Sequence, residues 1–98
     1  MAPVTDEQVE LVRGLVASIP AGHVATYGDI ASAAALSSPR IVGWIMRTDS
    51  SDLPWHRVIT ASGRPATHLA TRQLELLRAE GVLADDGRVE LATSRHVF

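Results

Sequence analysis

The segment "PWHRVI" (residues 54–59) holds the residue types best suited to chemistry, but it begins with an unreactive one. An imidazole next to a guanidinium, as at His56 and Arg57, could activate a nucleophile or bind an anion. The residue before this pair is Trp55, whose indole has no nucleophilic atom. The chain contains no cysteine, which excludes thiolate catalysis, disulfides and cysteine metal sites.

Other patterns for catalysis or cofactor binding do not occur in the sequence. The four histidines, at positions 23, 56, 68 and 96, lack the spacing of metal ligands, so we expect neither a metal nor a cofactor. There is no G-x-S-x-G motif for a serine nucleophile. The seven glycines are dispersed, which argues against a phosphate-binding loop.

The charges are unevenly distributed along the chain. The net charge of −2 by itself argues against a polyanionic partner. Residues 37–72, however, carry five arginines against two aspartates, a local charge of +3. Every basic residue except histidine is arginine, whose planar fork suits phosphates and guanine edges. Genomic base composition would explain the same usage, so both interpretations stay open.

The 98 residues are enough for one small domain, which we expect to span residues 1–98. No apolar run approaches the roughly 20 residues of a membrane span. The first residues have no signal-peptide pattern. We therefore expect a soluble, cytoplasmic protein with no membrane partner. We also expect it to be a monomer.

Two helix start signals stand in the first third of the chain. Thr5 and Gln8 form a capping-box pattern, and apolar residues at helical spacing extend that helix to Ile19. Thr26 begins a second helix, which an alanine-rich run continues to Ala35. Residues 23–25, between the two, are predicted to be extended.

A third helix is predicted to begin at Ser38, with proline at its first helical position. Arg40, Gly43 and Arg47 recur at spacings of three and four and therefore share one face. The apolar residues that form the buried stripe are Ile41, Val42, Ile45 and Met46. A short helix, a tight connection and a second helix with a polar face make a helix-turn-helix candidate.

The second half is predicted to hold a loop (49–54), an extended segment (55–59) and a turn (61–63). A fourth helix spans about 71–80, with Gly81 as its C-terminal cap. A hairpin then follows around Asp86-Gly87. A helix-turn-helix with a short C-terminal β-hairpin is the layout of a winged helix, so the predicted fold class is α+β and mostly helical.

Taken singly, the candidate residues also have ordinary structural interpretations. Tyr27 and Trp55 could be core aromatics, and His56 could be a structural hydrogen-bonding histidine. Arg40 falls in the first turn of the predicted third helix, where the helix dipole disfavours a cation. An anionic partner or plain solvation would each account for it. Single residues therefore leave the function open.

Several blocks taken together resemble the DNA-binding domain of the O6-alkylguanine-DNA alkyltransferases. They are "IPAGHVATYGDIA", "PRIVGWIM", "PWHRVI", and "SG" followed by a helix ending "LLRAEG", in this order and with similar spacing over roughly residues 6–83. The resemblance implies a winged helix-turn-helix that enters the minor groove and flips a guanine into a pocket beside a proline-cysteine-histidine-arginine motif. Trp55 stands in place of that acceptor cysteine, as in the alkyltransferase-like proteins, which cannot accept an alkyl group.

The resemblance assigns DNA- and lesion-binding roles to matching residues. Arg40 corresponds to the arginine that is inserted into the base stack, and Tyr27 to the tyrosine that helps rotate the target phosphate. Ser38 and Gly43 lie where the helix must approach the groove closely. The indole of Trp55 can contact a flipped base through its apolar face.

Further positions correspond to the wall and the support of the pocket. His56 and Glu80 match the histidine-glutamate couple that activates the thiol, and without a thiol we expect them to support the pocket together with Arg57. Asp49 stands where transferases usually carry an asparagine that supports the histidine. The loop over residues 63–73 is expected to contact the damaged base through one of three residues: Arg64, His68 or Arg72.

The resemblance implies a non-enzymatic damage sensor for O6-alkylguanine in double-stranded DNA. It would flip the base and flag the lesion for nucleotide excision repair proteins. The alternative is a sequence-specific winged-helix transcriptional regulator that reads the major groove. Against this alternative, the predicted recognition helix offers Arg40 and Arg47 but no Asn or Gln for reading bases.

Overall fold

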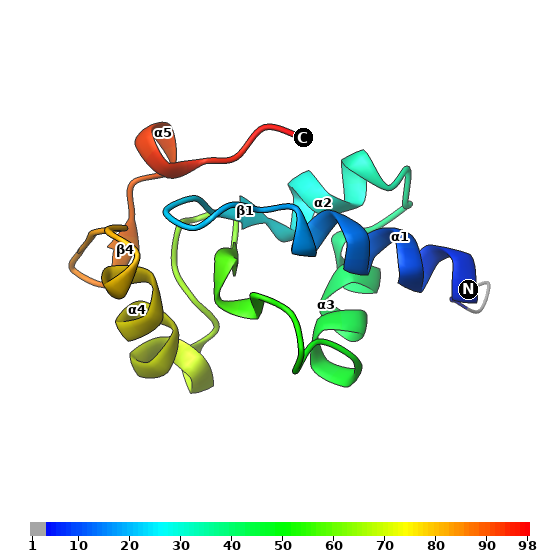
Figure 1. Cartoon of the computed structure of the whole chain (residues 1–98), viewed down its shortest axis with the longest axis horizontal. Coiled ribbons are helices and arrows are strands. Elements are labelled where there is room, and N and C mark those ends of the chain that lie inside the picture. Colours follow the sequence, from blue (N-terminus) through cyan, green and yellow to red (C-terminus); the bar gives the residue numbers. More distant parts are fainter. Residues whose placement is uncertain (1–3) are drawn as a thin grey trace.

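A computed structural model, which describes residues 4–98, shows short helices around two small sheets (Figure 1). The helices are α1 (Asp6–Ala17), α2 (Tyr27–Ala33), α3 (Pro39–Thr48), α4 (Ala70–Ala79) and α5 (Leu91–Ser94), with 3₁₀ turns η1 (Trp55–Arg57) and η2 (Thr67–Leu69). The strands are β1 (Ala25–Thr26), β2 (Val58–Ile59), β3 (Ala84–Asp85) and β4 (Arg88–Val89). β1 pairs with β2 in parallel and β3 pairs with β4 antiparallel. The predicted class, α+β and mostly helical, is confirmed.

The predicted helix caps are formed. The Thr5 hydroxyl accepts a hydrogen bond from the Gln8 amide at 3.1 Å, and the Gln8 side chain accepts one from the Thr5 amide. Thr26 and Asp29 make the same reciprocal pair at the start of α2. Ser38 caps α3 by accepting from the amide two residues on. Local hydrogen bonding therefore sets where these three helices begin.

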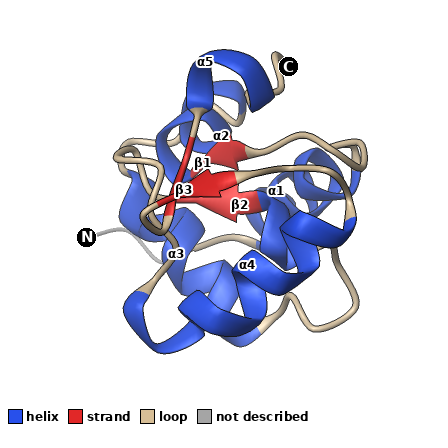
Figure 2. Ribbon diagram, turned by 90° about the vertical axis from the view of Figure 1, so that its left-hand side faces the viewer, coloured by secondary structure: helices blue, strands red, loops and turns tan. Residues whose placement is uncertain are grey.

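Other predicted boundaries were wrong. α1 ends at Ala17 and α2 at Ala33, two residues short of the predictions, and Ala35 is left-handed with φ 54°. The segment 55–59 is not extended throughout, because residues 55–57 form η1 and only Val58–Ile59 is a strand. The prediction did not include α5 (Figure 2).

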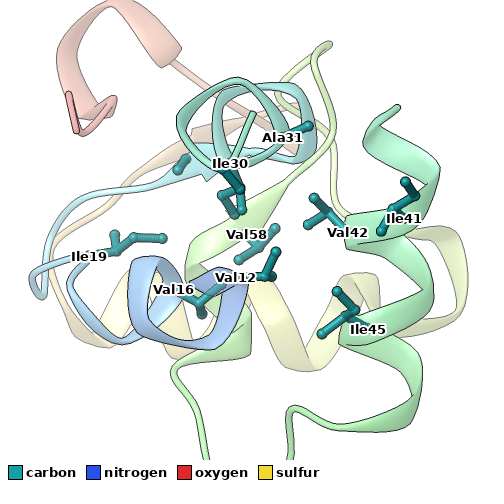
Figure 3. Packing of buried hydrophobic residues seen from close by; sticks show 11 residues of the cluster. Val12, Val16, Ile19, Ile30, Ala31, Ile41, Val42, Ile45 and Val58 are labelled. Carbon is teal, nitrogen blue, oxygen red and sulfur yellow. The ribbon is translucent and has the colours of Figure 1, made fainter. Parts of the chain in front are cut away.

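Two clusters of buried residues lie on opposite sides of the β1–β2 pair. The larger cluster joins α1, α2 and α3 to Val58, and Figure 3 shows Val12, Ile30 and Ile45 packed together there. Met46 of the predicted stripe is only partly buried at its edge. The smaller cluster joins the hairpin to α4 and consists of Val24, Ile59, Leu77, Val82 and Val89. Successive strand residues point to opposite faces, so in β2 Val58 belongs to the larger cluster and Ile59 to the smaller one.

The predicted hairpin turn is present and holds the loop before α4. Asp86 and Gly87 have φ of 53° and 75°, as a two-residue type I′ turn requires. The Val89 amide donates to the Gly63 carbonyl at 2.8 Å, and a Cβ at Gly63 would lie 2.5 Å from the Val89 carbonyl oxygen. The close approach therefore needs glycine at this position. No helix in residues 4–98 has the length and apolarity to cross a membrane.

Candidate nucleic-acid interface

A cleft of about 650 Å³ lies between α3 and the η2–α4 segment, which face each other in the lower half of Figure 1. One wall is the exposed face of α3, and the other is formed by residues 66–73. Tyr27 and Trp55 lie between these walls. The volume falls within the roughly 300–1,000 Å³ of small-ligand sites.

Two arginines of α3 form a positive rim on the cleft. Arg40 and Arg47 are exposed, line the cleft and lie seven residues apart, close to two turns of one helix face. Neither makes an ion pair with any residue in the range 4–98 that the structure describes. Gly43, between them, keeps the backbone of α3 accessible from the cleft.

Tyr27 is the first residue of α2, so the Thr26 cap fixes the backbone position from which the Tyr27 side chain projects. Burial raises the pKa of Tyr27, and the positive charge of Arg47 only partly opposes this effect. The phenol is therefore neutral at physiological pH and keeps its proton as a hydrogen-bond donor. A donor at this edge of the cleft suits an anionic oxygen.

Trp55 is a wall of the cleft and belongs to neither buried cluster of the described residues. Its backbone amide donates to the Leu53 carbonyl at 2.7 Å, which fixes the start of η1. The indole is partly exposed and meets the ring of His56 edge to face, with the ring centroids 6.1 Å apart. One side of the indole is thus held by protein while another remains available in the cleft.

Glu80 joins the other two residues expected to support the pocket, His56 and Arg57. His56 Nε2 lies 2.8 Å from Glu80 Oε2, and Arg57 donates from Nε and Nη2 to the same carboxylate at 2.7–3.2 Å. The Gly22 amide donates to it at 3.1 Å, and Arg57 Nη1 donates to the Ile19 carbonyl. Hydrogen bonds from Arg57 lower the pKa of Glu80 from 4.5 to about 2 against the opposing effect of burial, with further help from His56 and Gly22. The carboxylate thereby connects η1, the end of α4 and the 19–22 turn.

Two supporting residues were missed from the sequence. Gln73 is buried on α4 and donates from Nε2 to the carbonyls of His56 and Val58, at 3.0 and 2.7 Å. An amide four residues before Leu77, on the apolar face of the predicted helix, was a signal that could have indicated this role. Ser50 also lines the cleft, and its hydroxyl donates to the Met46 carbonyl.

Arg13 of α1 anchors the loop that leads from α3 to Trp55. Its guanidinium donates to the carbonyl and carboxylate of Asp49 at 2.8 and 3.1 Å, and to both carboxylate oxygens of Asp52 at 2.6–3.1 Å. The hydrogen bond from Arg13 lowers the pKa of Asp52 below its usual value. Asp49 thus bonds to Arg13, 36 residues away, which no local sequence pattern indicates.

The cleft distinguishes among the predicted loop residues. His68 lines it, whereas Arg64 donates to the Asp86 carbonyl of the hairpin at 3.0 Å. Arg72 is exposed on α4 and lies 3.6 Å from Glu75. Tyr27, Arg40, Gly43, Trp55 and His68 are therefore brought to the cleft, while Arg64, Arg72 and Ser38 are not among its lining residues. Residues 4–98 present no group of three or more acidic or histidine side chains that could hold a metal ion.

Residues 8–82 match the family described as 6-O-methylguanine DNA methyltransferase, DNA binding domain. The chain belongs to this family. The DNA base-flipping protein of Escherichia coli is 39% identical over 92% of this chain and 74% of its own length. Alkyltransferase-like protein 1 of Schizosaccharomyces pombe is 38% identical over 79% of this chain and 78% of its own. The resemblance to alkyltransferase-like proteins is confirmed.

Solved structures of the family share the fold. That of S. pombe Atl1 in complex with damaged DNA containing O6-carboxymethylguanine superposes with a TM-score of 0.85 at 31% identity. The match covers 94% of this chain and 96% of that one. The O6-methylguanine methyltransferase of Mycobacterium tuberculosis superposes with a TM-score of 0.67, also at 31% identity, over 84% of this chain but 52% of that one.

Proposed function

We propose that this protein is a non-enzymatic sensor that binds O6-alkylguanine in double-stranded DNA. The observation that carries the proposal is the cleft beside α3, with Arg40 at its rim and Trp55 in its wall. α3 enters the minor groove, Arg40 fills the gap in the base stack, and the flipped guanine occupies the cleft against the indole. A base-sized ligand fits a cleft of this volume, and flipping costs least for a modified base.

The residues around the cleft supply the remaining contacts. Tyr27 donates from its phenol to the phosphate of the rotated nucleotide, and Arg47 adds a second positive charge on the same helix face. His68, which lines the opposite wall, is the loop residue that contacts the base. Arg64 and Arg72 act further out, on the flanking phosphates.

The protein binds the lesion without repairing it. A transferase needs a thiolate where Trp55 stands, and the chain contains no cysteine. His56 and Glu80 form a hydrogen-bonded couple that, with Arg57, holds η1 in place. In this protein the couple positions the wall of the cleft instead of activating a nucleophile.

The bound complex then acts as a signal. A base held outside a bent duplex is a lasting distortion, and we propose that nucleotide excision repair proteins recognise it. The protein would work as a monomeric single domain over residues 1–98, in the cytoplasm, or at the nucleoid in a prokaryote.

The proposal is tested with two duplexes that differ only in one O6-methyl group. Fluorescence anisotropy should show stronger binding to the modified duplex, at the same salt concentration and in several sequence contexts. Equal binding to both, with affinity that follows the base sequence instead, would indicate the winged-helix regulator and contradict a damage sensor.

A further inference from the structure

Trp44 is an exposed aromatic residue on the helix that carries the arginine rim. The Trp44 side chain is 47% exposed. It does not line the cleft, and it belongs to neither buried cluster of residues 4–98. A single exposed apolar residue is ordinary on a protein surface. The position of Trp44 on α3 is what makes this one informative.

Trp44 lies four residues after Arg40 and three before Arg47, so its side chain neighbours both arginines on the helix surface. At about 3.6 residues per turn, Gly43 falls on one side of the line from Arg40 to Arg47, and Trp44 falls on the other. On the Gly43 side, Gly43 and Met46 line the cleft, whereas on the other side only Thr48, the last residue of α3, does and Trp44 does not. The indole therefore borders the arginine row on the side away from the cleft.

The surface around the indole of Trp44 suits DNA, which offers both charged phosphates and apolar sugar surfaces. Arg40 and Arg47 are exposed and make no ion pair within residues 4–98, so their charge is available to phosphates. Walls of the minor groove expose deoxyribose, against which a flat indole can pack. The indole N–H can also donate to the acceptors on the floor of the groove, which are present at every base pair.

We propose that Trp44 is a second DNA-contacting residue, which packs on the strand opposite the flipped nucleotide. This inference rests on the proposed function, because it requires α3 to lie in the groove with the flipped base in the cleft. The cleft then faces the damaged strand, so the other side of the arginine row faces the complementary strand. The contact is independent of the lesion and strengthens binding to any duplex.

The test compares Trp44→Ala with Leu11→Ala, in which a residue of α1 with the same 47% exposure is truncated. Trp44→Ala should weaken binding to modified and unmodified duplexes alike, by about tenfold, within the range of aromatic contacts to nucleic acid. The ratio of the two affinities should stay at the parent value. Leu11→Ala should bind as the parent does, and Trp44→Phe should retain most of the affinity.

A modified duplex locates the contact. Three nucleotides of the complementary strand, opposite the lesion site, are replaced by an alkyl linker that has no sugar or base. The parent should lose affinity on this duplex, and Trp44→Ala should lose less than the parent does, because its contact is already absent. An equal further loss in Trp44→Ala would place the contact elsewhere and overturn the assignment to this strand.

The two proposals fail in distinguishable ways. Unchanged binding of Trp44→Ala to both duplexes would overturn this inference, while a lesion preference in the parent would leave the proposed function intact. Weakened binding of Trp44→Ala without any lesion preference in the parent would contradict the sensor and leave Trp44 as a contact to undamaged DNA only. Loss of discrimination in place of general affinity would make Trp44 a lesion contact and overturn the inference. Thermal melting checks the fold, and Trp44→Gln provides a second truncation that keeps a good helix former.

Discussion

Replacing Trp55 with alanine separates a role in recognition from a role in folding. The indole lines the cleft, is partly exposed, and lies outside both buried clusters of residues 4–98. A fully buried tryptophan would cost about 3–5 kcal/mol of stability when truncated. For a partly exposed cleft residue we expect a loss of about 1–2 kcal/mol, so the variant should still fold at 25 °C.

The effect of Trp55→Ala on lesion binding should be larger than its effect on the fold. If the flipped base stacks on the indole, discrimination between modified and unmodified duplexes falls by about 1–3 kcal/mol, or roughly 5- to 150-fold. Anisotropy titrations with both duplexes measure this ratio. The matched control is Leu77→Ala, which truncates a fully buried residue away from the cleft. It should lower the melting temperature more and leave the ratio unchanged below the transition.

Fluorescence gives a second measurement on the same residue. In a Trp44→Phe background Trp55 is the only tryptophan, because the chain has two. Its emission should change on adding modified DNA and change less with unmodified DNA, at saturating concentrations of each. A Trp55→Ala variant that is unfolded at 25 °C, or an emission signal that does not respond to the lesion, would refute the assignment of Trp55 to the cleft wall.

Three further predictions concern the rim, the chemistry and the support of the cleft. Arg40→Ala should lose lesion affinity by a few kcal/mol in anisotropy titrations, because the unstacked site is left unfilled. The control is Arg78→Ala, which removes an exposed arginine away from the cleft. Arg13 would be a poor control because it anchors the 49–52 loop. Incubation with DNA carrying a labelled O6-methyl group should leave no label on the protein by mass spectrometry, and stoichiometric transfer would contradict a non-enzymatic role. Because the folded-state pKa of Glu80 is lowered to about 2, its stabilisation is present above pH 4.5 and is lost as the pH falls toward 2. Glu80→Gln should be less stable at pH 7 by roughly 1–2 kcal/mol after solvent screening, and the difference in melting temperature from the parent should shrink in that acid range.

The sequence alone predicted those features of the fold that depend on neighbouring residues. The caps at Thr5, Thr26 and Ser38 and the turn at Asp86-Gly87 each involve residues within four positions of one another. The η1 turn was not predicted for the opposite reason. The carbonyl of His56 in this turn accepts a hydrogen bond from Gln73, 17 positions along the chain, and no local pattern indicates such a contact.

For the site, the sequence determined the chemistry and the tertiary structure decided the geometry. The presence of Trp55 in a chain with no cysteine already removed the acceptor thiol, because composition alone decides whether a cysteine thiol exists. Only the folded chain shows that His68 lines the cleft, whereas Arg64 bonds to the hairpin and Arg72 lies near Glu75 on α4. The hydrogen bonds of Glu80 likewise join it to residues that lie between 23 and 58 positions away in the chain. Such contacts depend on the relative placement of whole helices, which local spacing does not encode.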